Sequence, residues 1–141
     1  MEPLKNTKKL SEILIDEYTS PATISADKDT SVMMIRKLMD ENNIRHVPIL
    51  EEGSAVGLIT DRDLKILGNL NFTDNVTASD IMINNPFSVV AGSSLENVIF
   101  DMSERKIGSV LVEDTAGNCV GIFTYIDAMN ALIEILRGEA E

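Results

Sequence analysis

The chain has one cysteine, one histidine and no tryptophan among its 141 residues. A single cysteine, Cys119, allows no intrachain disulfide, which is typical of a reducing compartment, and we expect a cytoplasmic protein. One histidine and one cysteine are too few ligands for a structural zinc site, so we expect no metal and no required cofactor. No apolar run approaches the roughly 18 residues of a membrane span, and the N-terminal stretch MEPLKNTKKLSEILIDEY has no continuous apolar core. We therefore expect neither membrane insertion nor a signal peptide.

Positive charge is also scarce. Lys and Arg number 12 against 23 Asp and Glu, which gives a formal net charge of -11. Nucleic acids and anionic membranes attract clustered Lys and Arg, so we expect no nucleic-acid partner. Apolar residues make up 44% of the chain, enough for one compact domain or for two small units that share a core.

What the chain does contain is a repeat. The segment HVPILEEGSAVGLITDRD (46–63) has a counterpart in SVLVEDTAGNCVGIFTYID (109–127). Both copies end in Gly, two apolar residues, Thr, two variable residues and Asp, which places Thr60 beside Asp63 and Thr124 beside Asp127. A duplicated small unit usually packs against its copy, because one unit cannot bury its apolar face alone.

The repeat extends toward the N-terminus of each copy. Residues 21–25 (PATIS) match 86–90 (PFSVV), and residues 11–15 (SEILI) match 79–83 (SDIMI). We therefore predict a first unit over residues 10–67, a linker rich in turn formers over 68–77, and a second unit over 78–136.

Each unit reads as strand, helix, strand, strand and helix. We expect short strands at 22–25 and 87–90, each before a helix. In the second unit Ser93 is expected to cap that helix, with Glu96 completing a capping box. The apolar stripes at helical spacing are Val32, Ile35, Leu38 and Met39 in the first unit, and Leu95, Val98, Ile99 and Met102 in the second.

The expected C-terminal helix, 127–137, is apolar over a broad face. That face comprises Ala128, Met129, Leu132, Ile133 and Leu136. Such breadth suggests contacts beyond the helix's own unit, and we expect a second chain there.

These linked motifs resemble a tandem pair of CBS domains, also called a Bateman module. The first unit carries RHVPIL followed by GLITDRDL, the second opens with ASDIMINNPFSVV, and the resemblance covers almost the whole chain. It implies an α/β fold (of the α+β type) with two pseudo-two-fold-related units, each with a small mixed sheet, and two clefts between them. It also implies an adenosine-containing ligand (AMP, ADP, ATP or S-adenosylmethionine), a regulatory role and a homodimer.

The repeated Thr-x-x-Asp has two interpretations. A carboxylate on the first turn of a helix can accept hydrogen bonds from both ribose hydroxyls, and Thr can reach a ribose or phosphate oxygen. This makes Thr60, Asp63, Thr124 and Asp127 the candidate ribose-binding residues. The same pattern is also an acidic capping box, which needs no ligand. The two roles are compatible.

The other site residues are assigned by the resemblance or by charge. The resemblance gives an adenine site made of Thr23, Ile24, Val47, Pro48, Ser88, Val89 and Val110, although the apolar members also fit a plain β core. The cations that could hold phosphates are Arg62, Arg45 and His46 in the first unit. The second unit has Tyr125-Ile126 in place of Asp61-Arg62 and so lacks the matching Arg. Of its two basic residues, Arg105 and Lys106, Lys106 is the nearest candidate by position, so we expect unequal sites.

Three functions remain. The first is a non-catalytic sensor that binds an adenosine-containing ligand and signals to an unknown effector protein on another chain. The second is a structural interaction module that binds no nucleotide. The third is an enzyme, which we do not expect, because the chain shows no phosphate-binding Gly-rich loop, nucleophile elbow or metal cluster, and we assign no catalytic residues.

Overall fold

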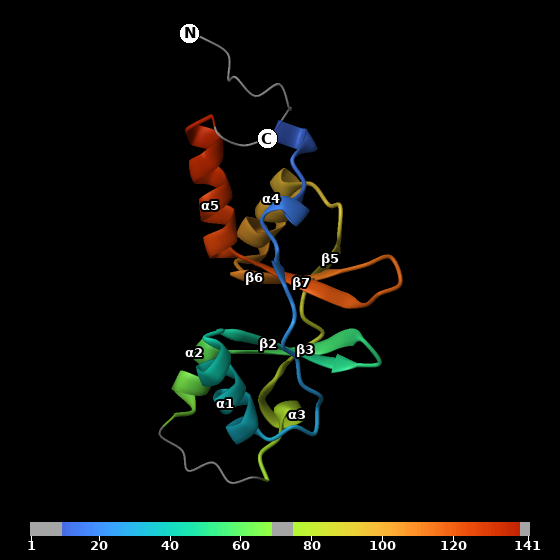
Figure 1. Cartoon of the computed structure of the whole chain (residues 1–141), viewed down its shortest axis with the longest axis vertical. Helices are drawn as coiled ribbons and strands as arrows, with labels where there is room; N and C mark the ends of the chain where they lie inside the picture. The colour runs from blue at the N-terminus through green and yellow to red at the C-terminus, as the bar shows by residue number, and fades with distance from the viewer. Residues whose placement is uncertain (1–9, 69–74, 139–141) are drawn as a thin grey trace. The chain divides into compact units, whose positions relative to one another are not determined.

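The computed structural model describes residues 10–68 and 75–138, drawn in colour in Figure 1. These residues form two compact units, described separately below. The Asp63 unit comprises residues 22–87 with 117–119. The Asp127 unit comprises residues up to 21, 88–116 and those from 120 onward. Most of the predicted linker, residues 69–74, lies outside the described residues.

The Asp63 unit is built on a three-stranded antiparallel sheet. Its strands are β2 (His46–Glu51), β3 (Ser54–Thr60) and β4 (Ile83–Asn84), in the order β2-β3-β4. Its helices, α1 (Val32–Asn42), α2 (Asp61–Ile66) and α3 (Ala78–Ile81), lie on one side of the β2–β3 pair (Figure 1). The buried core joins these layers through Val32, Ile35, Met39, Val47, Ile49, Ile59, Leu64 and Ala78.

The Asp127 unit has a four-stranded mixed sheet in the order β1-β7-β6-β5. The strands are β1 (Ser20–Pro21), β5 (Ser88–Val90), β6 (Ser109–Glu113) and β7 (Cys119–Thr124). β1 is antiparallel to β7, and β5 is parallel to β6. Two helices, α4 (Leu95–Arg105) and α5 (Tyr125–Leu136), and two 3-10 turns, η1 (Leu10–Glu12) and η2 (Ile15–Glu17), complete the unit. The mixed α/β architecture agrees with the predicted fold class.

Each compact unit contains a segment from the other sequence repeat. In the Asp127 unit, Leu95 N–H donates to Ile13 O at 2.8 Å and Ile15 N–H donates to Ser93 O at 3.0 Å. Ile13 and Ile15 are almost fully buried. In the Asp63 unit, the matching bonds join Val32 N–H to Val76 O (2.9 Å) and Ala78 N–H to Thr30 O (2.8 Å). Helix α4 therefore begins against a segment that the linear repeat assigns to the first copy, and α1 begins against Val76 of the predicted linker and Ala78 of the second copy.

The first residues of α1 and α4 are set by N-caps that place the apolar side chains of each helix in the core. Ser31 caps α1 by accepting from Met34 N–H, and Ser94 caps α4 by accepting from Asn97 N–H, both at 3.1 Å. The predicted cap at Ser93 is wrong: its hydroxyl donates to Val90 O at 2.6 Å. A start at Leu95 buries that residue together with Val98 and Met102, and places Glu96 one position too early for a capping box.

The predicted strand at 22–25 is not formed. Only Ala26 makes an isolated parallel bridge, to Ile49, and residues 22–25 pair with no strand. These residues connect Pro21, which pairs with β7, to the body of the Asp63 unit, so no neighbouring strand runs alongside them. In the Asp127 unit the corresponding prediction is confirmed by β5.

Candidate functional site

The first Thr-x-x-Asp motif lies at the junction of β3 and α2. Thr60 is the last residue of the strand and the N-cap of the helix. Its backbone N–H donates to Oδ2 of Asp63 at 3.0 Å, and Asp63 N–H donates to Oγ1 of Thr60 at 3.2 Å. The capping box predicted as one of the two interpretations is therefore present.

The box uses one oxygen of the Asp63 carboxylate. Within residues 10–68 and 75–138, Asp63 makes no further side-chain hydrogen bond or ion pair, so Oδ1 has no protein partner there. Asp63 is half-buried, and its side chain is fixed by the box. The result is a positioned carboxylate with an open acceptor at the start of a helix, where the backbone also favours negative ligand groups.

The second motif forms the same capping box. Thr124 N–H donates to Oδ2 of Asp127 at 2.9 Å, and the Thr124 hydroxyl lies 3.3 Å from that same oxygen. Both halves of the box are present in each motif, since the Thr side chain also accepts from the backbone N–H of the Asp. Within residues 10–68 and 75–138, Oδ1 of Asp127 has no protein partner, as is the case for Oδ1 of Asp63.

Both motifs are tied to the residue that precedes the neighbouring strand. Asp61 N–H donates to Arg45 O at 2.8 Å, and Tyr125 N–H donates to Gly108 O at 2.9 Å. In the Asp63 unit, His46 also pairs with Thr60 across β2 and β3. The structure thus brings Arg45 and His46, two of the predicted phosphate-binding residues, beside the Thr60 motif.

Arg62 and Lys106, the other two cations, are exposed. Arg62 lies inside the first motif, on the first turn of α2. Lys106 is the C-cap of α4, with a positive φ of 56°, and precedes Gly108 by two residues. Arg62 is therefore part of the first motif, whereas Lys106 is connected to the second motif only through Gly108, whose carbonyl accepts from Tyr125 N–H.

The seven predicted adenine-binding residues fall into three groups: Thr23 and Ile24 before Ala26, the buried Val47, Pro48 and Val110, and the half-buried Ser88 and Val89 of β5. Thr23 is exposed and Ile24 is half-buried, and the bond from Ala26 N–H to Pro48 O (3.1 Å) holds the end of their segment against β2. Val47 and Val110 are fully buried, so their side chains belong to the core and only their backbone groups are available at a surface.

The strand register changes which residues of the two units correspond. The bonds to Arg45 O and Gly108 O make Ile49 the counterpart of Val112. Ala26 bridges to Ile49 and Val89 pairs with Val112, so the structural counterpart of Val89 is Ala26. The sequence match, which aligned Ile24 with Val89, is two residues out of register here. Ser25, the structural counterpart of Ser88, was therefore not among the residues predicted from the sequence to bind adenine.

A third Thr-x-x-Asp box was also missed, although the pattern is readable at residues 77–80. Thr77 N–H donates to Oδ2 of Asp80 at 2.9 Å, and this box begins the short helix α3. It has no preceding Gly-apolar-apolar strand, and Asp80 is exposed. The box therefore supplies an internal comparison for the other two, since it has the capping bonds without the Gly-apolar-apolar strand that precedes them.

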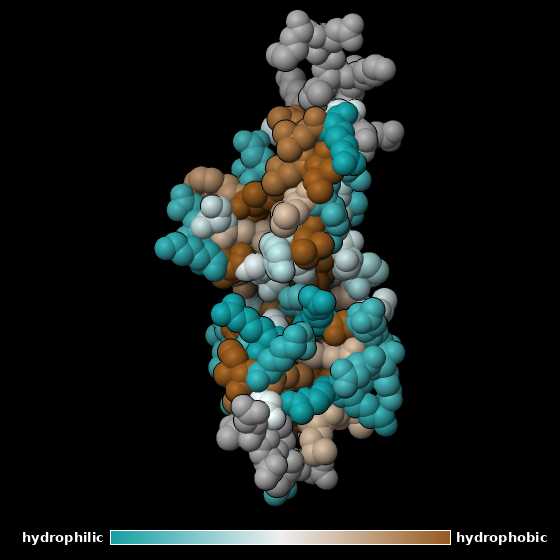
Figure 2. Space-filling model, turned by 90° about the vertical axis from the view of Figure 1, so that its left-hand side faces the viewer, coloured by the Kyte–Doolittle hydropathy of each residue, from teal (hydrophilic) through white to brown (hydrophobic). Residues whose placement is uncertain are grey.

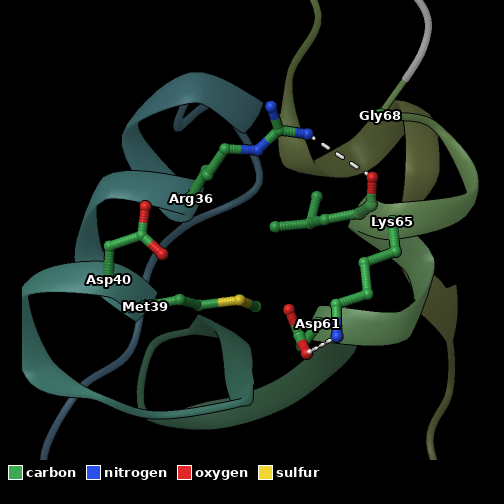
Figure 3. A pocket seen from close by; sticks show the side chains of 7 residues that line it. Arg36, Met39, Asp40, Asp61, Lys65 and Gly68 are labelled. Carbon is green, nitrogen blue, oxygen red and sulfur yellow. Dashed lines mark hydrogen bonds and ion pairs between the residues drawn. The ribbon is translucent and has the colours of Figure 1, made fainter.

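A pocket of about 320 Å³ opens between α1 and α2 on the Asp63 unit (Figure 3). Arg36 Nη2 donates to Leu64 O at 3.4 Å, and Lys65 Nζ pairs with Asp61 Oδ2 at 3.1 Å. The lining residues are Arg36, Met39, Asp40, Asp61, Leu64, Lys65 and Gly68. None of them is a predicted site residue, and three of their four charged groups already have protein partners.

Two further properties concern only the described ranges, 10–68 and 75–138. No group of three or more His, Cys, Asp and Glu side chains in them is arranged to hold a metal ion. No helix there is long and apolar enough to cross a membrane.

Comparison with known proteins gives the family context of this site. The family model for the CBS domain matches residues 15–67 and again residues 78–134. A CBS domain-containing protein of Dictyostelium discoideum is 25% identical over 138 residues, which covers 89% of this chain and 95% of that protein. The L-aspartate semialdehyde sulfurtransferase of Methanocaldococcus jannaschii is 32% identical over 116 residues, covering 81% of this chain but only 22% of that enzyme.

A solved structure is similar over most of the chain. The CBS domain pair of the protein MJ0100, in complex with 5'-methylthioadenosine and S-adenosyl-L-methionine, matches with a TM-score of 0.76 and 28% sequence identity. The match covers 86% of this chain and 97% of that one.

Proposed function

The chain belongs to the CBS domain family, with two copies of the domain, and we propose that it is a non-catalytic regulatory module that binds an adenosine-containing ligand. The observation that carries this proposal is the Asp63 carboxylate, which is fixed through Oδ2 and open at Oδ1. Vicinal ribose hydroxyls are two adjacent donors, and an ionised carboxylate is a strong, charge-assisted acceptor for them. The Asp127 carboxylate would take the same role in the other unit.

The ligand class is supported by the similar domain pair of MJ0100, which was crystallised with two adenosine compounds. Neither compound carries a phosphate, and both share the ribose that a carboxylate recognises. AMP, ADP and ATP share it too, and they need cations in addition. Arg45, His46 and Arg62 would supply these near the Thr60 motif.

We propose that the two sites are unequal. Arg62 stands inside the first motif, whereas Tyr125 and Ile126 occupy the matching positions of the second. The first motif would therefore bind phosphorylated ligands, and the second would bind a less charged adenosine compound more weakly or remain empty.

The module would signal by changing its contacts with another protein. A ligand can cause such a change only when it binds one arrangement of the module better than another. We propose a homodimer as the working unit and an effector protein as the target. We do not assign the activity of the sulfurtransferase to this chain, because the match spans only 22% of that enzyme.

An interaction module without a nucleotide is the second candidate. The Thr77–Asp80 box supports it, since the same Thr-x-x-Asp pattern forms capping bonds there outside the repeated Gly-apolar-apolar context. Under that account the Thr60 and Thr124 motifs would be caps as well.

Calorimetric titration of the wild-type chain with AMP, ADP, ATP, 5'-methylthioadenosine and S-adenosylmethionine separates the two candidates. We expect saturable binding of at least one compound, and no conversion of that compound during the titration, as followed by chromatography. A folded protein that binds none of the five would support the interaction module. Turnover of any ligand would contradict the non-catalytic role.

A further inference from the structure

The pocket between α1 and α2 of the Asp63 unit has an apolar floor and a charged rim (Figure 3). Met39 and Leu64 form the floor, and these two residues are only 5% and 4% exposed. The rim carries two cations and two carboxylates, namely Arg36 and Asp40 from α1 and Asp61 and Lys65 from α2. The volume of about 320 Å³ falls within the range of small-molecule sites, roughly 300–1,000 Å³. The pocket is therefore large enough for a small ligand.

Asp40 is the rim residue without a partner. Asp61 and Lys65 pair with each other at 3.1 Å, and Arg36 Nη2 donates to Leu64 O at 3.4 Å. In the part of the chain that the structure describes, the Asp40 carboxylate makes no hydrogen bond or ion pair. It makes none although Arg36 lies four residues earlier on the same helix, at a spacing that favours an ion pair. An acceptor on the α1 side of the pocket is thus available to a cationic group.

The positive groups of the rim are suited to an anionic group. Figure 3 shows the Arg36 side chain extending from α1 toward α2, where Lys65 lies. The bond from Arg36 to Leu64 O is longer than the usual length of about 2.9–3.0 Å, so an ionised carboxylate would be the better acceptor. A guanidinium also presents its donors as a planar fork that matches a carboxylate.

The charged rim is not required by the fold, because the same pair of helices in the Asp127 unit lacks it. Counting from the N-cap of each helix makes α4 the counterpart of α1 and α5 the counterpart of α2. Both floor positions stay buried there, as Met102 and Ala128. The four rim positions are uncharged, and they hold Ile99, Ser103, Tyr125 and Met129.

The surfaces of the two units differ accordingly. Figure 2 faces the side on which α2 and α5 lie in Figure 1. It shows hydrophobic side chains along α5 but mainly hydrophilic ones over the part of the Asp63 unit that contains α2. Ligand sites typically combine an apolar lining with a few polar groups that orient the ligand. The rim of the pocket therefore indicates a ligand that carries charges of its own.

We infer that this pocket binds a small zwitterion of the amino-acid class with an aliphatic side chain. The ammonium group pairs with Asp40, the carboxylate with Arg36 and Lys65, and the aliphatic side chain covers the apolar floor. A ligand with charge of only one sign would lie beside like-charged groups of the rim, which is unfavourable. The inference is independent of the proposed nucleotide site, because the pocket uses none of the residues assigned to that site.

Amide NMR spectra of the wild-type chain, titrated with L-leucine, test the pocket. We expect saturable shifts confined to α1 and α2, with a Kd of about 1 mM or tighter, which a ligand of this size can reach. Isoamylamine has the same carbon chain without the carboxylate, and isocaproate has it without the ammonium group. Each should bind at least about tenfold more weakly than L-leucine. Glycine should also bind more weakly, because it has no side chain to cover the floor.

Substitutions at the rim test the two charged contacts separately. Asp40→Asn removes the partner of the ammonium group and should weaken L-leucine binding at least about tenfold. Arg36→Gln should have a similar effect through the carboxylate. Glu41→Gln is the matched control, because Glu41 follows Asp40 on the same helix, pairs with Lys37 and does not line the pocket. It should bind L-leucine like the wild type.

Three results would overturn the inference: no saturable L-leucine shifts in α1 and α2, isoamylamine or isocaproate binding as tightly as L-leucine, or Asp40→Asn binding as tightly as Glu41→Gln. Nucleotide titrations of the same samples are read separately. A chain that binds L-leucine here but no nucleotide keeps this site and removes the proposed nucleotide function, whereas the opposite result does the reverse.

Discussion

Thr60 and Asp63 hold each other in a reciprocal pair of hydrogen bonds, from Thr60 N–H to Asp63 Oδ2 at 3.0 Å and from Asp63 N–H to Thr60 Oγ1 at 3.2 Å. The pair explains how one short motif can serve both stability and binding. The backbone bond fixes the carboxylate against the start of α2, and the remaining oxygen has no partner within the described residues, which is why we propose it as the ligand acceptor.

The cap and the ligand role can be separated by two substitutions at Asp63. Asp63→Ala removes the acceptor for Thr60 N–H and should lower the free energy of unfolding by about 1 kcal/mol, as for other lost caps. Asp63→Asn keeps an amide oxygen for that N–H and should lower it by less than half as much. Thermal or urea unfolding monitored by circular dichroism measures both, and equal losses for the two variants would contradict the assignment.

The glycine that precedes each Thr-x-x-Asp motif, Gly57 or Gly121, pairs with a two-residue edge strand. Gly57 pairs with Asn84 of β4, and Gly121 pairs with Pro21 of β1. A Cβ on Gly57 would clash with Sδ of Met82 and lie 2.8 Å from its Cγ and 3.1 Å from its Cβ, all on one flexible side chain. A Cβ on Gly121 would lie 2.5 Å from Thr19 Cγ2 and 3.0 Å from the Ser20 carbonyl oxygen, which is backbone.

Gly121→Ala should therefore be the more damaging change. We expect it to cost about 2–3 kcal/mol of unfolding free energy, and Gly57→Ala about 1 kcal/mol, because Met82 can move and the Ser20 backbone cannot. Urea denaturation of the two variants beside the wild type measures this difference. The reverse order would show that β1 yields more easily than the Met82 side chain.

Tyr18 should make stability sensitive to alkaline pH. Burial raises the pKa of the Tyr18 phenol, and the hydrogen bond to Glu134 and the charge of that carboxylate raise it further. The raised pKa means that the folded protein holds the proton which the unfolded chain releases above about pH 10. The contribution is complete below that pH and is lost as pH rises beyond it.

Replacing Tyr18 by Phe removes this titration. The variant should be about 1 kcal/mol less stable at neutral pH, from the lost hydrogen bond. Its stability should then fall less steeply than that of the wild type above about pH 10. Unfolding free energies measured from neutral to alkaline pH give both values, and parallel curves for the two proteins would contradict the role of Tyr18.

Arg62 should distinguish phosphorylated from unphosphorylated ligands. Because we propose that Arg62 contacts phosphate and not the nucleoside, Arg62→Gln should weaken AMP or ATP binding by about tenfold and leave 5'-methylthioadenosine binding nearly unchanged. Arg105→Gln, on α4 of the other unit, is the matched control. An equal loss for both ligand types, or an equal effect of Arg105→Gln, would remove Arg62 from the phosphate site.

Local sequence patterns correctly predicted the features that depend on residues close together in the chain, namely the buried face of a helix and the capping boxes. The apolar stripe of α4 predicted the burial of Leu95, Val98 and Met102, and the Thr-x-x-Asp pattern predicted the two boxes. The cap of α4 was misplaced by one residue because Ser93 and Ser94 are both good capping residues. Only the fit of Leu95 into the core selects Ser94.

The features that depend on distant parts of the chain were not predictable in this way. The insertion of Ile13 and Ile15 beside α4 joins residues separated by about 80 positions, and no local signal encodes it. The two-residue shift that makes Ala26 the counterpart of Val89 follows from strand pairing rather than from residue type. The free Asp63 Oδ1 likewise became visible only once the box partners of the other oxygen were known.

The most direct test of the central claim compares three proteins in one calorimetric titration with the tightest-binding adenosine compound. Asp63→Asn should weaken binding at least about tenfold, because an amide offers less to the ribose than a carboxylate does. Asp80→Asn, the same change in the box without a preceding Gly-apolar-apolar strand, should bind like the wild type. Equal affinities in all three proteins would contradict the account and show that the Thr60–Asp63 pair is a helix cap alone.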